Sequence, residues 1–200
     1  MLRLHYAPRT ISVAVAIVLE ELGLDYTPVL VDFSKSEQTG DTYRAVNPKG
    51  RVPALETPKG VLTETGAILE YIAPDLVPAD PFEAAKMREL MCYLSSTMHI
   101  NHAHGYRGGR WADDPQAIAE MKRKMPETMA ASCAYVAQAL PLLAASADGK
   151  ITLAEACLYV VLTWLPGDGV DIDDYPNLSA FQQKMDARQS IRTVRDMGML

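Results

Sequence analysis

The stretch that decides the fold runs from Tyr43 to Ile72 and reads YRAVNPKGRVPALETPKGVLTETGAILEYI. Pro48 and Gly50 predict a turn, because proline fixes its own φ and glycine adopts conformations that a Cβ disfavours. The apolar strand that follows begins at Val52-Pro53. Since proline lacks the N–H that a central strand donates, we expect an edge or a special geometry there, such as a cis peptide bond.

A second turn at residues 57–60 predicts an antiparallel hairpin between residues 54–56 and 61–63. A helix should come next, because four apolar residues recur with spacings of three and four. These are Ala67, Ile68, Tyr71 and Ile72. At its start, Glu64-Thr65 combines a hydroxyl with free backbone N–H groups, which suits a bound carboxylate. The stretch alone also fits a thioredoxin-like domain whose turns only shape the fold.

The first 74 residues predict the order strand, helix, strand, helix, hairpin, helix, which is a thioredoxin-like α/β domain (βαβ-ββα). The first two strands, residues 2–7 and 26–31, should be parallel and joined by a right-handed crossover around a helix that ends at Gly23. The polar residues 32–41 should form a surface loop. Three prolines within eight residues, Pro74, Pro78 and Pro81, mark a linker, which we place at residues 75–81.

Residues 82–200 predict an all-α domain, a helical bundle. A long helix at 82–104 should end in the glycine-containing loop 105–111. Pro126 should kink or break the next helical region, because proline removes a backbone donor. The remaining predicted segments are a helix at 115–145, a central helix at 151–164, a turn at 173–177 and short helices at 178–187 and 190–197.

The composition excludes several classes of protein. A hydrophobic content of 48% and a charged content of 22% are those of an ordinary globular protein. A net charge of −6 argues against a general nucleic-acid or anionic-membrane binder, which needs a basic face. Cys92, Cys133 and Cys157 form no C-x-x-C pair and indicate reduced thiols that pack in the core. With no signal peptide and no long apolar run, we expect a cytoplasmic protein.

The stretch quoted above resembles the glutathione-binding half of the glutathione S-transferase family. The matching pieces are Asn47–Gly50, Val52–Leu55 and Thr63–Thr65 leading into Ala67-Ile68. The resemblance implies that Val52, before a cis Pro53, offers its backbone to the cysteinyl part of glutathione. It also implies that Glu64 and Thr65 hold the γ-glutamyl end.

The second half resembles the helical domain of the same family, including a buried capping box at Thr152 and Glu155 whose role is structural. Within the family the chain is most similar to bacterial beta-class enzymes, in Tyr6–Gly23 and Leu94–Ser96. That class carries a cysteine before a serine at the first helix, where this chain has Ile11-Ser12. A mixed disulfide with glutathione at this point is therefore excluded.

A transferase of this kind must present glutathione as thiolate, whereas a free thiol with a pKa of about 8.5 is mostly protonated at neutral pH. Three hydroxyls remain as candidates to stabilise the anion near the first helix: Ser12, Tyr6 and Thr10. Ser12 matches the serine of the beta-class pair, and Tyr6 matches the tyrosine of the tyrosine-type classes. In structural terms alone, Ser12 is an ordinary helix residue and Tyr6 a core aromatic.

Four more residues follow from the resemblance. His99 falls where beta-class enzymes carry a histidine at the domain cleft, and Lys35 matches a lysine that contacts glutathione. Ser96 and Thr97 would reach glutathione held by the other subunit of a homodimer, although the class has an acidic residue in place of Thr97. We expect no metal, since the residues around His99 lack an acidic or cysteine ligand and the aspartates at 168–174 resemble a solvated loop.

The sequence therefore predicts a cytosolic, homodimeric glutathione S-transferase that conjugates reduced glutathione to small hydrophobic electrophiles. It needs no metal, nucleic acid or membrane. The electrophile would lie between residues 7–9 and the first long helix of the second domain, with Tyr106 and Trp111 as lining residues. Two alternatives stay open: a transferase-like binding or scaffold protein without catalysis, and a glutathione-dependent peroxidase, isomerase or dehalogenase.

Overall fold

The structure is a computed structural model that describes residues 1–140 and 149–200. By their internal packing these residues form two units. The first comprises Met1–Val77, the described part of 145–160, and Met185–Leu200. The second comprises the described part of 78–144 together with Val161–Lys184.

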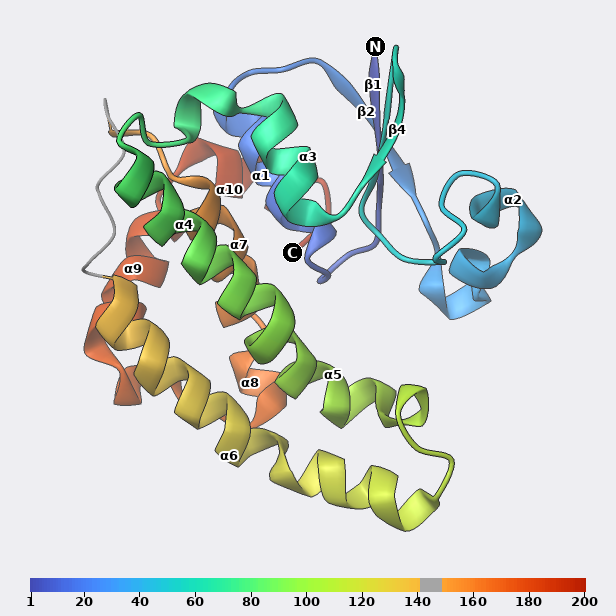
Figure 1. Ribbon diagram of the computed structural model, residues 1–200, viewed down its shortest axis with the longest axis vertical. Helices are drawn as coiled ribbons and strands as arrows, with labels where there is room; N and C mark the ends of the chain where they lie inside the picture. Colours follow the sequence, from blue (N-terminus) through green and yellow to red (C-terminus); the bar gives the residue numbers. More distant parts are fainter. Residues whose placement is uncertain (141–148) are drawn as a thin grey trace. The chain divides into compact units, whose positions relative to one another are not determined.

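A four-stranded sheet forms the centre of the first unit (Figure 1). Its strands are β1 (Leu2–Tyr6), β2 (Tyr26–Leu30), β3 (Ala54–Thr57) and β4 (Gly60–Thr63), in the order β2-β1-β3-β4. β1 and β2 are parallel, while β1 with β3 and β3 with β4 are antiparallel. The predicted parallel pair and the predicted hairpin are both confirmed, as is the thioredoxin-like fold of this half.

Helices cover both sides of the sheet. Figure 1 shows α1 (Ser12–Glu21) and α3 (Thr65–Ile72) on one side and the short α2 (Asp41–Arg44) on the other. α1 also packs against α10 (Gln189–Asp196), and its residues from 12 to 19 are all buried. This enclosure explains why α1 is apolar around most of its circumference. Two 3-10 turns, Phe33–Lys35 and Glu37–Thr39, occupy the predicted surface loop.

The capping box predicted at the start of α7 (Leu153–Leu162) is confirmed. The Thr152 backbone N–H donates to Glu155 Oε2 at 2.6 Å, and the Glu155 N–H donates to Thr152 Oγ1 at 3.1 Å. Two donors at the helix start are thereby satisfied reciprocally. This segment lies in the first unit, and α7 continues into the second unit after Val160.

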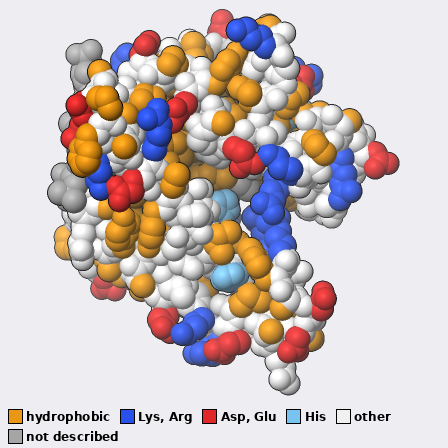
Figure 2. Space-filling view, viewed as in Figure 1, with side chains coloured by type: hydrophobic (Ala, Val, Ile, Leu, Met, Phe, Trp, Pro, Cys, Tyr) orange, Lys and Arg blue, Asp and Glu red, His pale blue; other side chains and the backbone are white. Residues whose placement is uncertain are grey.

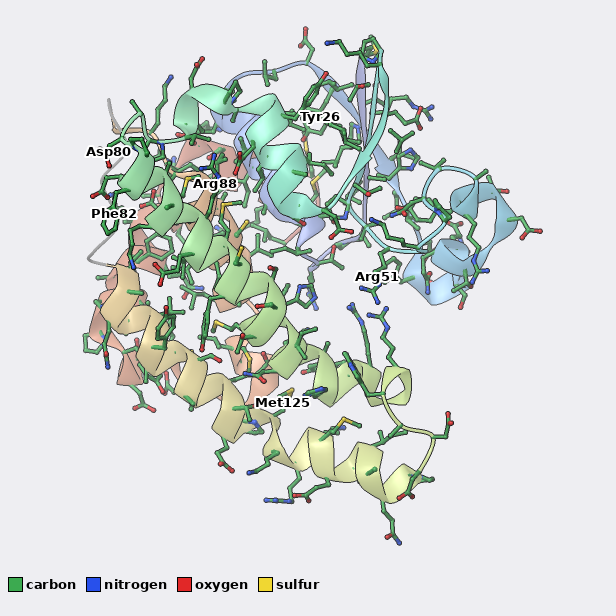
Figure 3. All side chains as sticks on the ribbon, viewed as in Figure 1. Tyr26, Arg51, Asp80, Phe82, Arg88 and Met125 are labelled. Atoms are coloured by element: carbon green, nitrogen blue, oxygen red, sulfur yellow. The ribbon has the colours of Figure 1, made fainter. Side chains whose placement is uncertain are left out.

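The first long helix of the second unit is longer than predicted and changes its winding. It comprises α4 (Pro81–Tyr93), a π-helical segment (Leu94–Met98) and α5 (His99–Arg107), so the predicted end at residue 104 is passed by three residues. Asp80, which Figure 3 labels beside Phe82, caps α4 by accepting the N–H groups of Phe82 and Glu83. Short π-helical segments inside α-helices occur often at functional sites.

Pro126 was predicted to kink or break this helical region. The break is absent, because α6 runs as one helix from Pro115 to Ala139, while Figure 1 shows that this helix bends along its length. An added Cβ at Gly169 would lie 3.3 Å from Pro126 Cγ, so this glycine leaves room for the proline ring. Met125 points from α6 toward α5, as Figure 3 shows, and fills the space left by Gly105. The predicted end of this helix at 145 lies outside the described residues.

Three of the remaining helices, α7, α9 (Pro176–Asp186) and α10, match their predictions within a few residues. The short α8 (Leu165–Asp168) was not predicted. A 3-10 turn at Ile172–Asp174 occupies the start of the predicted turn. No helix in the described part of the chain is long and apolar enough to cross a membrane.

Candidate functional site

The loop before β3 is held by hydrogen bonds to a single carbonyl. Asn47, which is 1% exposed, donates from Nδ2 to the Arg51 carbonyl at 2.6 Å, and the Tyr43 hydroxyl donates to the same oxygen at 2.7 Å. Burial raises the pKa of Tyr43 to about 12, so that hydroxyl keeps its proton. The backbone leading to Val52 is therefore fixed from inside the fold.

The Val52–Pro53 peptide bond is cis, as predicted. Pro53 is buried, and pairing of β3 with its neighbours starts at Ala54, so Val52 lies just outside the ladder. Gly50 adopts a φ of +61°, and a Cβ there would lie 2.7 Å from the Gln38 carbonyl oxygen. Only glycine fits this turn without a shift of the backbone.

The Glu64-Thr65 corner has an unusual backbone. Glu64 adopts φ +70° and ψ +119° immediately before α3, a conformation that costs a side-chain-bearing residue about 1–3 kcal/mol and is often found at ligand sites. Thr65 is the first residue of α3 and is partly exposed. Lys49 forms an ion pair with the Glu64 carboxylate and donates to Thr63 Oγ1 at 2.7 Å. Sequence reasoning gave Lys49 no role.

Two of the three candidate hydroxyls are in direct contact in the loop before α1. Thr10 Oγ1 and Ser12 Oγ lie 2.6 Å apart. Ser12 is fully buried and its Oγ accepts the Ala7 N–H at 3.2 Å, whereas Thr10 is partly exposed and its hydroxyl donates to the Ala7 carbonyl at 2.8 Å. Tyr6, the last residue of β1, is also partly exposed. Ser12 therefore lies behind Thr10 rather than at the surface.

Lys35 forms an ion pair with Asp32 on the first 3-10 turn, with Nζ 3.1 Å from Oδ2. Hydrogen bonds from Ser34 and then Lys35 lower the pKa of Asp32 to about 2, and Asp32 in turn raises the pKa of Lys35. The Lys35 side chain is 72% exposed. It is accessible to an anionic ligand, in competition with Asp32.

Comparison with known proteins identifies the chain. Residues 3–74 match the family model of the glutathione S-transferase N-terminal domain. The chain is 32% identical over 199 residues to the glutathione S-transferase GstA of Escherichia coli O157:H7, covering 96% of each chain. The chain belongs to the glutathione S-transferase family.

Solved structures agree with this assignment. A glutathione transferase homologue from Sulfitobacter, determined with bound glutathione, superposes with a TM-score of 0.92 at 47% identity and covers 100% of this chain and 99% of its own. A sphingomonad glutathione S-transferase in complex with glutathione gives a TM-score of 0.83 at 29% identity, with 99% of each chain covered. The predicted similarity to bacterial and beta-class-like members is confirmed.

In this glutathione S-transferase the predicted site residues fall in both units. Tyr6, Thr10, Ser12, Lys35, Val52, Pro53, Glu64 and Thr65 belong to the first unit, and Ser96, Thr97 and His99 to the second. Ser96 is exposed and Thr97 partly exposed in the π-helical segment. His99 opens α5, with its ring centroid 5.0 Å from that of Trp164.

One feature of the transferase was not predicted from its sequence. Asp168, expected in a solvated loop, is instead 0% exposed and binds the His102 imidazole. No local pattern joins two residues 66 positions apart. Among the residues that the structure describes, no group of three or more His, Cys, Asp or Glu side chains is placed to hold a metal ion.

Proposed function

We propose that this chain is a cytoplasmic, homodimeric glutathione S-transferase. It detoxifies small hydrophobic electrophiles by conjugating reduced glutathione to them. The observation that carries the proposal is the Glu64-Thr65 corner. Glu64 has a positive φ, directly precedes α3 and forms an ion pair with Lys49. The Glu64 carboxylate can accept a hydrogen bond from an amino group of a ligand. The Thr65 hydroxyl and the N–H groups at the start of α3 can donate to a carboxylate of the same ligand. The γ-glutamyl end of glutathione carries both partners.

The remaining contacts with glutathione are assigned by the same proposal. The backbone of Val52, outside the sheet ladder, holds the cysteinyl part beside Pro53, and the exposed Lys35 pairs with the glycyl carboxylate. Ser96 and Thr97 contact glutathione bound to the other subunit. His99 contacts the thiol or the second substrate.

Thr10 and Ser12 supply the thiolate stabilisation. Thr10 is the catalytic residue, because it is the more exposed hydroxyl of the pair and can donate to the sulfur. Ser12 positions it: when Thr10 donates to sulfur, Ser12 donates to Thr10 Oγ1 while accepting the Ala7 N–H. Donors in such a chain polarise one another. Each pKa unit by which the thiol is lowered corresponds to about 1.4 kcal/mol.

Calorimetric titration with reduced glutathione tests the proposal. The wild-type chain should bind, and Thr65→Ala should weaken binding by about 10- to 150-fold, since one hydrogen bond to a charged group is worth about 1.5–3 kcal/mol. Thr63→Ser, which keeps the hydroxyl that contacts Lys49, is the matched control and should bind like the wild type. If calorimetry detects no binding at millimolar glutathione, the transferase proposal is refuted and the scaffold alternative is favoured.

A further inference from the structure

The helix α10 ends in a Schellman motif, a glycine-containing turn that satisfies the last carbonyls of a helix. Gly198 has a φ of +71°, and its N–H donates to the Arg195 carbonyl at 2.9 Å. The N–H of Met199 donates to the Val194 carbonyl at 3.0 Å. The chain therefore leaves α10 in a fixed direction.

Met199 connects this turn to the loop before α1. Its carbonyl accepts the Arg9 N–H at 2.8 Å. Met199 is 0% exposed, so it lies beneath the surface that Figure 2 shows, and water does not compete for this hydrogen bond. Both residues belong to the first unit, and the C mark in Figure 1 lies beside the loop that leads from β1 into α1. The loop is thus held by a residue far from it in the sequence.

Arg9 has a backbone conformation that residues with a Cβ rarely adopt. Its φ is +57°. Such conformations persist where the surrounding contacts hold them. The next residue, Thr10, is fixed on its other side, because its carbonyl accepts the Val13 N–H at 3.0 Å. The position of Thr10 is therefore set jointly by the start of α1 and by the hydrogen bond between Arg9 and Met199.

We propose that Met199 is a positioning residue for the thiolate-stabilising hydroxyl of Thr10. By accepting the Arg9 N–H, its carbonyl keeps Arg9 left-handed and Thr10 Oγ1 at 2.6 Å from Ser12 Oγ. Loss of this hydrogen bond lets Arg9 relax to a negative φ, which carries the Thr10 hydroxyl away from Ser12 and from the sulfur. The inference rests on the proposed transferase function, and it makes the acidity of bound glutathione depend on how α10 ends.

Substitution of Gly198 tests this role without removing a side chain. An added Cβ meets no described atom within 4 Å beyond its chain neighbours, so Gly198→Ala acts through the backbone, where it disfavours the positive φ that brings Met199 to Arg9. With 1-chloro-2,4-dinitrobenzene as the electrophile, it should raise the pKa of bound glutathione by about half a unit and lower kcat below that pKa by about threefold. KM for glutathione should be maintained, because the contacts assigned to Val52 and Glu64 are untouched. Gly198→Asn should keep the wild-type values, because asparagine tolerates this conformation.

The end of α1 supplies a matched control. Gly23 occupies the same position of a second Schellman motif, with a φ of +62° and with the Leu24 N–H donating to the Leu19 carbonyl at 3.0 Å. An added Cβ at Gly23 also meets no described atom within 4 Å. Gly23→Ala should therefore lower the unfolding free energy about as much as Gly198→Ala does, while the thiol pKa and kcat stay at their wild-type values.

A double variant separates an action through Thr10 from a general loosening of the first unit. In the Thr10→Val background, Gly198→Ala should raise the thiol pKa no further, because two substitutions that remove the same interaction are not additive. The role of Met199 would be overturned by a further shift in that background, by an equal shift from Gly23→Ala, or by no shift from Gly198→Ala.

The hydrogen bond can also be tested apart from the transferase function. If the wild type fails to bind glutathione in calorimetry, the proposed function itself is overturned. Exchange of the Arg9 amide hydrogen with solvent then still reports on the contact with Met199. Gly198→Ala should accelerate this exchange and Gly23→Ala should not, and equal exchange in both variants would show that the turn after α10 does not hold Arg9.

Discussion

Thr10 Oγ1 lies 2.6 Å from Ser12 Oγ, and both hydroxyls also contact backbone atoms of Ala7. Because the buried Ser12 acts through Thr10, removal of the two hydroxyls should have different effects. Thr10→Val should raise the pKa of bound glutathione by about one unit, equivalent to about 1.4 kcal/mol, and lower kcat correspondingly. Titration of the bound thiolate by its ultraviolet absorbance measures this shift.

Ser12→Ala should lower the unfolding free energy more than Thr10→Val does. It leaves the buried Ala7 N–H without its acceptor, which costs about 1–3 kcal/mol. Denaturant unfolding measures the difference. Tyr6→Phe serves as the comparison and should leave the thiol pKa unchanged. If Tyr6→Phe is instead the variant that raises it, the assignment to Thr10 is wrong.

Glu64 offers a way to separate binding from stability. Glu64→Gly removes the carboxylate and also relieves the positive φ, so glutathione affinity should fall while the unfolding free energy rises by about 1 kcal/mol. Glu64→Gln keeps the backbone cost and should lose affinity without gaining stability. Calorimetry and denaturant unfolding on the same samples test both effects. Wild-type affinity in both variants would show that this carboxylate does not contact glutathione.

The cysteines should differ sharply in reactivity. Cys92 is exposed, so its predicted core packing is wrong, whereas Cys133 and Cys157 are buried as predicted and burial raises their pKa values to about 12. The thiolate is the reactive form, so iodoacetamide near pH 8 should add one group to the native protein, at Cys92. The unfolded protein should take up three. Intact-mass spectrometry counts the additions, and Cys92→Ser should abolish the native one. A second native addition would show that the core opens readily.

Local signals in the sequence were sufficient for the part of the first unit between residues 43 and 72. The turn at Gly50, the proline at position 53 and the hairpin each depend on residues close in the chain, and the structure has all three. The family motif around Glu64 also predicted where the helix begins. A positive φ at a glutamate has no signature in sequence and could only be found in the structure.

Features that depend on distant residues could not be predicted. Pro126 looked like a helix break because its tolerance depends on Gly169, 43 positions later, whose lack of a side chain admits the proline ring. Asp168 looked solvated because its partner, His102, lies on another helix. Whether a side chain is buried, and which groups surround it, depends on the packed fold. A local sequence pattern indicates only which secondary structure and exposure its own segment favours.

The pair between Glu21 and Arg188 provides a pH-dependent test of the first unit. Glu21, at the end of α1, also accepts a hydrogen bond from Ser190 at 2.7 Å, and its side chain is 9% exposed. Burial raises the pKa of Glu21, but hydrogen bonds from Arg188 and Ser190 outweigh it, so the pKa is below its ordinary value of 4.5. A carboxyl whose pKa is lowered by folding stabilises the fold above that ordinary value.

Glu21→Gln should therefore lower the unfolding free energy at pH 7 by about 2 kcal/mol, as expected when a hydrogen-bonded charge is lost. The difference from the wild type should shrink as the pH falls below 4.5 through the folded-state pKa, because the wild-type carboxylate then becomes protonated. Urea unfolding at a series of pH values measures it. Glu120→Gln, which breaks an exposed pair with Arg123, should change little at any pH. A pH-independent difference for Glu21→Gln would mean that shape, not charge, holds α1 to the segment that leads into α10.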